Sequence, residues 1–160
     1  MKAIESLKEK FSDKIISHDS FAGQDFITAK KECLKDMAVF LRDELHFDFL
    51  SDLTCVDYKG YPGRENAPRF ETVYHFYSHK TKERISLKFP IEETSPNIDS
   101  LTGLWLAANW YEREVYDMYG IHFTGHPDLR RILMYEEFKG HPLRKDYPLK
   151  ARQPRIPHED

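Results

Sequence analysis

The spacing of hydrophobic residues changes twice along this chain, and that change limits the folds it can adopt. Apolar residues recur at the helical period across residues 29–46. In Arg84–Ile91 they alternate with polar residues, as in a strand with one buried face. The helical period returns across 102–120. Because helical segments flank a run of strands instead of alternating with each strand, the pattern favours an α+β domain with a mainly antiparallel sheet.

Turn residues divide the rest of the chain into short elements. Residues 1–11 form an amphipathic helix, and Gly23 separates two strands at 15–22 and 26–28. Thr28 is the expected N-cap of the helix at 29–46, and Gly120 is the expected C-cap of the later helix. Further strands are expected at 49–58, 69–78 and 84–91, separated from other elements by loops at 60–68 and 92–100. The last two strands should pair as an antiparallel hairpin in a sheet of four or five strands.

The 160 residues suffice for a single domain with a hydrophobic core. We place the α+β domain at residues 1–140 and an extended tail, rich in proline and basic residues, at 141–160. The formal net charge of −3 gives no general attraction for nucleic acid. No segment approaches the ~18 uninterrupted apolar residues of a membrane span, and the charged start is no signal peptide. We therefore expect contact with a membrane only through partner proteins.

Neither the cysteines nor the histidines have the spacing of a metal site. Cys33 and Cys55 make neither a zinc framework nor a disulfide scaffold, so we expect both to be reduced and buried. His122 and His126 are four residues apart, but the glycines and proline around them disfavour a shared helical face. His126 and His141 each precede proline, which biases the backbone toward an extended turn. We predict structural hydrogen bonds for these histidines.

The densest group of charges lies in the later helix. Glu112, Arg113 and Glu114 are followed by Asp117 within two helical turns. Arg113 and Asp117 have the spacing of an ion pair, although such a pair is worth only ~0.3–0.5 kcal/mol on an exposed helix. Acids beside Trp110 indicate a contact surface or a buried pair. The alternative is an ordinary charged helix face.

Ten residues at fixed spacing extend this group: Glu112, Arg113, Glu114, Asp117, Met118, Tyr119, His126, Arg130, Ile132 and Leu133. In type and order they resemble the hallmark segment of the C-subunit family of NADH:quinone oxidoreductase, the respiratory complex I. The wider stretch at 105–147 is similar too, and it adds Asp128, Arg131, His141, Arg144, Lys145 and Asp146. The resemblance spans residues 49–149, whereas the first 48 residues match only in layout.

The resemblance implies a scaffold protein with no catalytic residue, cofactor or metal of its own. The flavin and iron–sulfur clusters that carry electrons from NADH to quinone would lie in partner subunits. The chain would pack against the large quinone-site subunit of the peripheral arm, on the cytoplasmic face of the bacterial inner membrane. The charged residues and histidines of the hallmark stretch would be structural or interface residues. Two isolated cysteines agree with this, because a usual cluster needs four thiolates.

Other interpretations remain open. A membrane-bound hydrogenase or a related dehydrogenase uses homologous subunits, and this chain alone does not identify the electron donor. A stand-alone hydrolase or metal-binding domain could use Glu114, Asp117 and His126 for acid–base work, but no nucleophile motif accompanies them. The basic tail is a frayed end, a nucleic-acid arm or an extended strap over a neighbouring protein, and we favour the strap.

Overall fold

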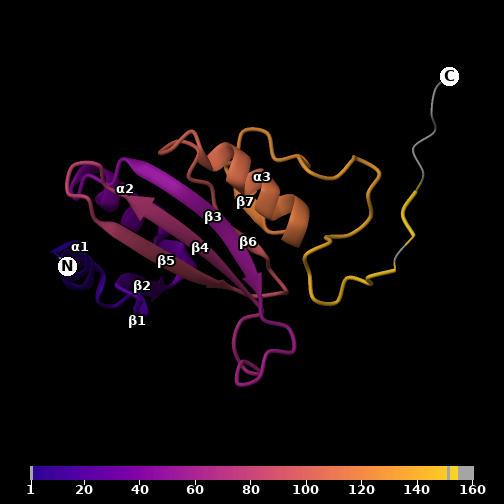
Figure 1. The fold of residues 1–160 in the computed structure, drawn as a ribbon, viewed down its shortest axis with the longest axis horizontal. Coiled ribbons are helices and arrows are strands. Elements are labelled where there is room, and N and C mark those ends of the chain that lie inside the picture. Colours follow the sequence, from indigo (N-terminus) through magenta and orange to yellow (C-terminus); the bar gives the residue numbers. More distant parts are fainter. Residues whose placement is uncertain (1, 151, 155–160) are drawn as a thin grey trace.

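The computed structural model describes residues 2–150 and 152–154. It confirms an α+β domain built on one five-stranded sheet of order β1-β2-β5-β4-β3 (Figure 1). The strands are β1 (Ile15–Phe21), β2 (Gln24–Ala29), β3 (Phe49–Asp57), β4 (Phe70–Tyr77) and β5 (Arg84–Ile91). Neighbouring strands are antiparallel except for β2 and β5, which are parallel. The sheet is therefore mixed, with one parallel contact joining two antiparallel groups.

The two hairpins follow the turn chemistry of the sequence. Ala22 and Gly23 both have positive φ (51° and 76°), as the tight turn between β1 and β2 requires. β4 and β5 pair without interruption from Phe70 opposite Ile91 to Tyr77 opposite Arg84, which confirms the predicted hairpin. The alternation in β5 places Ile85, Leu87, Phe89 and Ile91 in the core.

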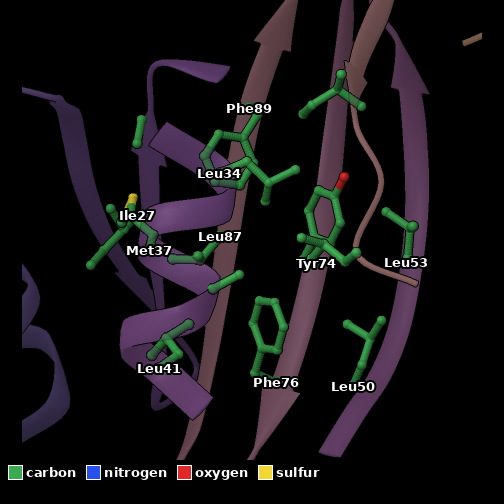
Figure 2. Packing of buried hydrophobic residues seen from close by; sticks show 14 of the residues in the cluster. Ile27, Leu34, Met37, Leu41, Leu50, Leu53, Tyr74, Phe76, Leu87 and Phe89 are labelled. Atoms are coloured by element: carbon green, nitrogen blue, oxygen red, sulfur yellow. The ribbon is translucent and has the colours of Figure 1, made fainter. Parts of the chain in front are cut away.

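Within the described residues, three α-helices accompany the sheet: α1 (Lys2–Phe11), α2 (Leu34–Asp43) and α3 (Ala108–Tyr119). The apolar side chains of all three join the strands in one core cluster. Figure 2 shows α2 packed against the sheet, with its apolar side chains opposite those of β4 and β5; the labelled residues are Ile27, Leu34, Met37, Leu41, Leu50, Leu53, Tyr74, Phe76, Leu87 and Phe89. Burial of this apolar surface is the main stabilising contribution to such a domain.

The predicted start of the second helix is wrong. Thr28 lies inside β2, opposite Ser17 on one side and Lys88 on the other, so it cannot be an N-cap. Lys30 is extended (ψ 136°), and a short 3₁₀ helix, η1 (Lys31–Cys33), precedes α2. Pairing with two neighbouring strands therefore outweighed the helical spacing of the residues that follow.

The third helix also begins later than predicted, at residue 108 instead of 102. Residues 101–107 form successive turns, in which the amides of Leu104 and Trp105 both bond to the carbonyl of Leu101. Gly120 ends the helix in the left-handed conformation (φ 74°), which confirms the predicted C-cap.

Sequence patterns missed two short strands, β6 (Asn97–Asp99) and β7 (His122–Thr124), which pair in parallel. Three residues are too few to show a period of two, and β6 lies in what the pattern predicted to be a loop. In the part of the chain that the structure describes, no helix has the length and apolar content to cross a bilayer.

Candidate functional site

Asp117 organises the chain that follows β7. Its fully buried carboxylate lies in the last turn of α3. The Oδ2 atom accepts hydrogen bonds from the backbone amides of Ile132 (3.1 Å), Leu133 (2.8 Å) and Met134 (2.8 Å), and Arg131 Nη1 donates to Oδ1 at 2.6 Å. Burial alone would raise the pKa of Asp117, but these donors outweigh it and hold the pKa below its usual range. One charged oxygen pair thus fixes an irregular segment of backbone.

The predicted ion pair between Arg113 and Asp117 is wrong. The Arg113 guanidinium donates through Nε and Nη2 to the carbonyls of Arg130 and Arg131, each at 3.2 Å, and lies 5.3 Å from the ring centre of Trp110. Asp117 pairs with Arg131 instead. A buried carboxylate needs several converging donors, and the backbone of the following segment supplies more of them than one arginine on the same helix could.

The same segment then returns to cover the C-terminus of α3. His141 Nδ1 donates to the carbonyl of Asp117 at 3.0 Å, and Arg144 Nε donates to the carbonyl of Tyr119 at 2.6 Å. These bonds occupy carbonyls that the end of a helix leaves without a partner in the helix. Burial lowers the pKa of His141, so its ring acts here as a neutral donor.

A second network joins the tail to the sheet through Arg69. Its guanidinium binds Asp57 in a bidentate pair (2.9 and 2.7 Å) and binds Asp146 at 2.7 and 3.1 Å. The backbone amide of Lys145 adds a bond of 2.9 Å to Asp57. The hydrogen bonds from Arg69, and then from Lys59, hold the pKa of Asp146 well below its usual range. The side chain of Asp146 is 43% exposed, whereas Arg69 and Asp57 are buried.

Sequence reasoning singled out Lys145 and Asp146 but missed Asp57 and Arg69. The available signal was weak: two opposite charges at the facing ends of strands joined by one loop. Asp57 pairs with Phe70, the residue next to Arg69, in the ladder between β3 and β4. Only the tertiary fold shows that residues 88 positions apart meet there.

The remaining predicted residues lie around the start of the same segment. His126 connects its Nε2 to the carbonyl of Asn109 (3.2 Å), and its Nδ1 accepts the amide of Asp128 (3.0 Å). Asp128 and Arg130 form an exposed pair at 3.0 Å, and Glu114 is exposed on α3. The turn around the His–Pro step is thus held through both ring nitrogens, Nε2 as donor and Nδ1 as acceptor.

Glu112 belongs to the core and not to this network. Its side chain is fully buried, and Oε1 accepts the backbone amide of Leu101 at 2.6 Å. Burial raises the pKa of Glu112 to about 7. The three acids that looked alike in the sequence therefore differ: Glu112 and Asp117 are buried with separate partners, and Glu114 faces solvent.

The residues suggested for acid–base work do not form one site. The carboxylate of Asp117 accepts hydrogen bonds from four donors, and the ring of His126 is hydrogen-bonded to two backbone groups. Glu114 lies on the exposed side of the helix. Among residues 2–150 and 152–154, no three His, Cys, Asp or Glu side chains are grouped closely enough to bind a metal ion. Cys33 and Cys55 are buried as free thiols, and burial raises the pKa of Cys55 to about 12.

A serine, a histidine and an aspartate do lie in a row elsewhere, on three paired strands. His75 Nδ1 is 2.7 Å from Ser86 Oγ, and Asp52 is the partner of His75 across the ladder. Ser86 is only 4% exposed and lies within the paired stretch of β5, where its backbone belongs to the ladder. A hydrolase instead needs an accessible nucleophile beside free donors for the oxyanion. The row is better explained as cross-strand polar packing.

Large apolar side chains are exposed just before α3, on it and after it. Leu106 and Trp110 are 88% and 59% exposed, and together with Pro127 they line an open groove of about 490 Å³. Leu133 and Leu149 are 55% and 98% exposed farther along the chain. The polar networks hold this region in place, and its apolar groups point outward.

Fold and networks together define a small α+β module whose buried charges hold an extended segment against the end of α3. A solved structure of Nqo5, its trypsin-resistant fragment 1–134, matches with a TM-score of 0.72 at 30% identity, covering 81% of this chain and 100% of that one. A chain of the membrane-bound sulfane sulfur reductase, an archaeal respiratory membrane complex, has the same fold (TM-score 0.71, 19% identity, 94% of this chain and 88% of that one).

The sequence assigns the module to a particular family. The family model for the respiratory-chain NADH dehydrogenase 30 Kd subunit matches residues 27–153, and the chain belongs to this family. The C subunit of the NADH-quinone oxidoreductase from Citrifermentans bemidjiense is 46% identical over 150 residues (94% of this chain, 90% of that protein). Its counterpart from Roseiflexus sp. is 49% identical over 152 residues (94% and 84%). These findings confirm the resemblance found in the hallmark segment.

Proposed function

We propose that this chain is a non-catalytic scaffold subunit of a proton-translocating NADH:quinone oxidoreductase and packs against its large quinone-site subunit. Partner subunits hold the flavin and the iron–sulfur clusters, and this chain holds none. It works in the peripheral arm of the complex, on the cytoplasmic face of the inner membrane, where its partners retain it. Its contribution is a rigid shape and an adhesive surface.

The observation that carries this proposal is the form of residues 125–154, which we name the arm. In its described residues, 125–150 and 152–154, the arm has no helix or strand, yet buried Asp117 and Arg69 hold it in a single path beyond the end of α3 (Figure 1). It turns Leu133, Leu143 and Leu149 toward solvent. Apolar groups on an ordered surface with polar surroundings are typical of a protein contact.

Similarity in sequence favours NADH over another electron donor. Named subunits of NADH-quinone oxidoreductases are 43–50% identical to this chain. The sulfane sulfur reductase chain shares the fold at 19% identity, which shows only that the fold is compatible with more than one complex. The second candidate is the equivalent subunit of a related membrane-bound hydrogenase or dehydrogenase.

Affinity purification from membranes tests the proposal. An affinity-tagged chain, solubilised gently, should co-purify with flavin and iron–sulfur subunits and with the quinone-site subunit, as identified by mass spectrometry. Leu133→Glu and Leu143→Glu should reduce that recovery at least tenfold, because each places a charge in an apolar contact. Phe21→Glu is the matched control, since Phe21 is 78% exposed on β1, away from the arm.

A scaffold role also predicts the rate at which the assembled complex turns over. Complexes that do assemble with the arm variants should oxidise NADH at the wild-type rate per complex. Full assembly together with slowed electron transfer would contradict the scaffold role, and normal recovery of both arm variants would contradict the arm as the contact. Recovery of hydrogenase subunits would replace the proposed complex with the second candidate.

A further inference from the structure

One glutamine folds the end of the arm back on itself. The side-chain amide of Gln153 pairs with both polar groups of one residue: Oε1 accepts the amide of Lys139 at 2.9 Å, and Nε2 donates to the carbonyl of Lys139 at 3.0 Å. The same Nε2 donates to the hydroxyl of Tyr147. The hydroxyl of Tyr135 donates to the carbonyl of Pro154 at 2.8 Å. We name the pairing of Gln153 with Lys139 the clasp.

A small aromatic cluster connects the clasp to the body of the domain. The ring of Tyr147 stacks on that of Phe138 with 6.0 Å between ring centres, and the Arg131 guanidinium lies 5.7 Å from the centre of the Phe138 ring. Arg131 also binds the buried carboxylate of Asp117 and donates to the carbonyl of Gly140 at 3.0 Å. Gly140 has φ +93°, and a Cβ there would lie 3.0 Å from the ring of Tyr147. Contacts therefore run from α3 through Arg131 and the rings to the clasp.

Between Tyr147 and Gln153 the chain presents one apolar side chain beside cations. Leu149 is 98% exposed, and Lys150 and Arg152 are exposed as well. This stretch of the sequence contains no acid. An apolar group held in place beside positive charges suits an apolar pocket with carboxylates at its rim. One leucine buries too little apolar surface to hold a protein on a bilayer, which favours a protein pocket over a lipid surface.

We propose that the clasp positions the arm for its subunit contact: Gln153 closes the end of the arm before the partner binds, so that Leu149 enters an apolar pocket rimmed by carboxylates on the partner. The pocket rests on the proposed function of this chain, whereas the clasp does not. An open chain end would lose its conformational freedom on binding, and a closed end has already lost much of it. Gln153 therefore raises the affinity of the contact without stabilising the domain, because its bonds to Lys139 lie at the exposed end of the arm.

Amide hydrogen exchange in the full chain, followed by NMR, tests the clasp. Gln153→Met keeps the length of the side chain and removes its hydrogen bonds, so the amide of Lys139 should exchange roughly fivefold faster than in the wild type. The amide of Leu133, which bonds to buried Asp117, is the internal reference and should not change. Gln24→Met, at an exposed glutamine of β2, is the matched control. Equal exchange of Lys139 in the wild type and Gln153→Met would overturn the clasp.

Competition in cells tests what the clasp does. A variant and a wild-type chain with different tags are expressed together, and their ratio is measured in the complex purified through a tag on the quinone-site subunit. Gln153→Met should be incorporated roughly threefold less than the wild type, with an unchanged melting temperature. Leu149→Glu should be incorporated roughly tenfold less, because it places a charge in the apolar pocket. Gln24→Met should compete equally.

The outcomes separate this inference from the proposed function. Normal incorporation of Gln153→Met, or a melting temperature lowered by it, overturns the positioning role. Normal incorporation of Leu149→Glu overturns the pocket, and the proposed function fails with it only if Leu133→Glu and Leu143→Glu are incorporated normally too. Vesicles of phosphatidylcholine and phosphatidylglycerol test the lipid surface: sedimentation of the full chain with them that Leu149→Glu abolishes would overturn the protein pocket.

Discussion

The fully buried carboxylate of Asp117 receives three consecutive backbone amides and one guanidinium, all from a partly exposed segment. Its removal leaves these partly buried donors without their shared acceptor, which is costlier than losing the bonds alone. Asp117→Ala should therefore lower the free energy of unfolding by ~3 kcal/mol, measured by urea denaturation. Asp128→Ala, which breaks an exposed pair in the same segment, should cost less than ~1 kcal/mol. Equal losses would show that the arm does not depend on the buried carboxylate.

Glu112 makes stability depend on pH in the direction opposite to most acids. Its pKa is raised from 4.5 to about 7 in the folded chain, so the folded state binds the proton more tightly than the unfolded state. The resulting stabilisation is complete below about pH 4.5 and is lost as the pH rises through 7. The difference between wild type and Glu112→Gln should change by ~3 kcal/mol across that range in urea denaturation. Parallel pH curves for the two proteins would contradict this assignment.

At the end of α3, Gly120 has a positive φ, and the side chains of His141 and Arg144 lie close to its Cα. Gly120 has φ +74°, and a Cβ there would lie 2.5 Å from His141 Nε2 and 2.7 Å from Arg144 Nη2. Gly63 has φ +80° but open space around the same position, which makes it a matched control. Gly63→Ala should cost ~1–2 kcal/mol from backbone strain alone. Gly120→Ala should cost at least ~1 kcal/mol more by thermal denaturation, because the cap contacts must move. Equal costs would mean that His141 and Arg144 do not press on the helix end.

Elements with a local cause could be predicted from the sequence, and those with a distant cause could not. β5 was predicted with its observed bounds because its alternation and its burial agree, and Gly120 was predicted as a cap because the helical pattern stops there. The beginning of α3 was missed because the amide of Leu101 is held by Glu112, eleven residues ahead. Asp57 and Arg69 were missed for the same reason, since the fold brings them their tail partners, the amide of Lys145 and the carboxylate of Asp146.

Across the whole molecule, residues 141–147 act as part of the body, since His141, Arg144 and Asp146 each bind α3 or the sheet. Two truncations test where the predicted tail begins. Ending the chain after Gly140 removes all three residues and should lower the melting temperature by roughly 10 °C, because buried Arg69 loses the carboxylate of Asp146 and buried Asp57 loses the amide of Lys145. Ending it after Lys150 should leave the melting temperature nearly unchanged. Equal melting temperatures would support a tail that starts at residue 141.

The order of the strands in the sheet also determines when each strand can pair during synthesis of the chain. The β1-β2 hairpin and the β3-β4 pair touch the rest of the sheet only through β5, which lies between them and is the last of the five to leave the ribosome. At ~5–20 residues per second, the first hairpin must wait several seconds for its parallel neighbour. During that interval the edge of β2 that will later bind β5 is open to other chains, so protection of the nascent N-terminus becomes part of how this protein is made.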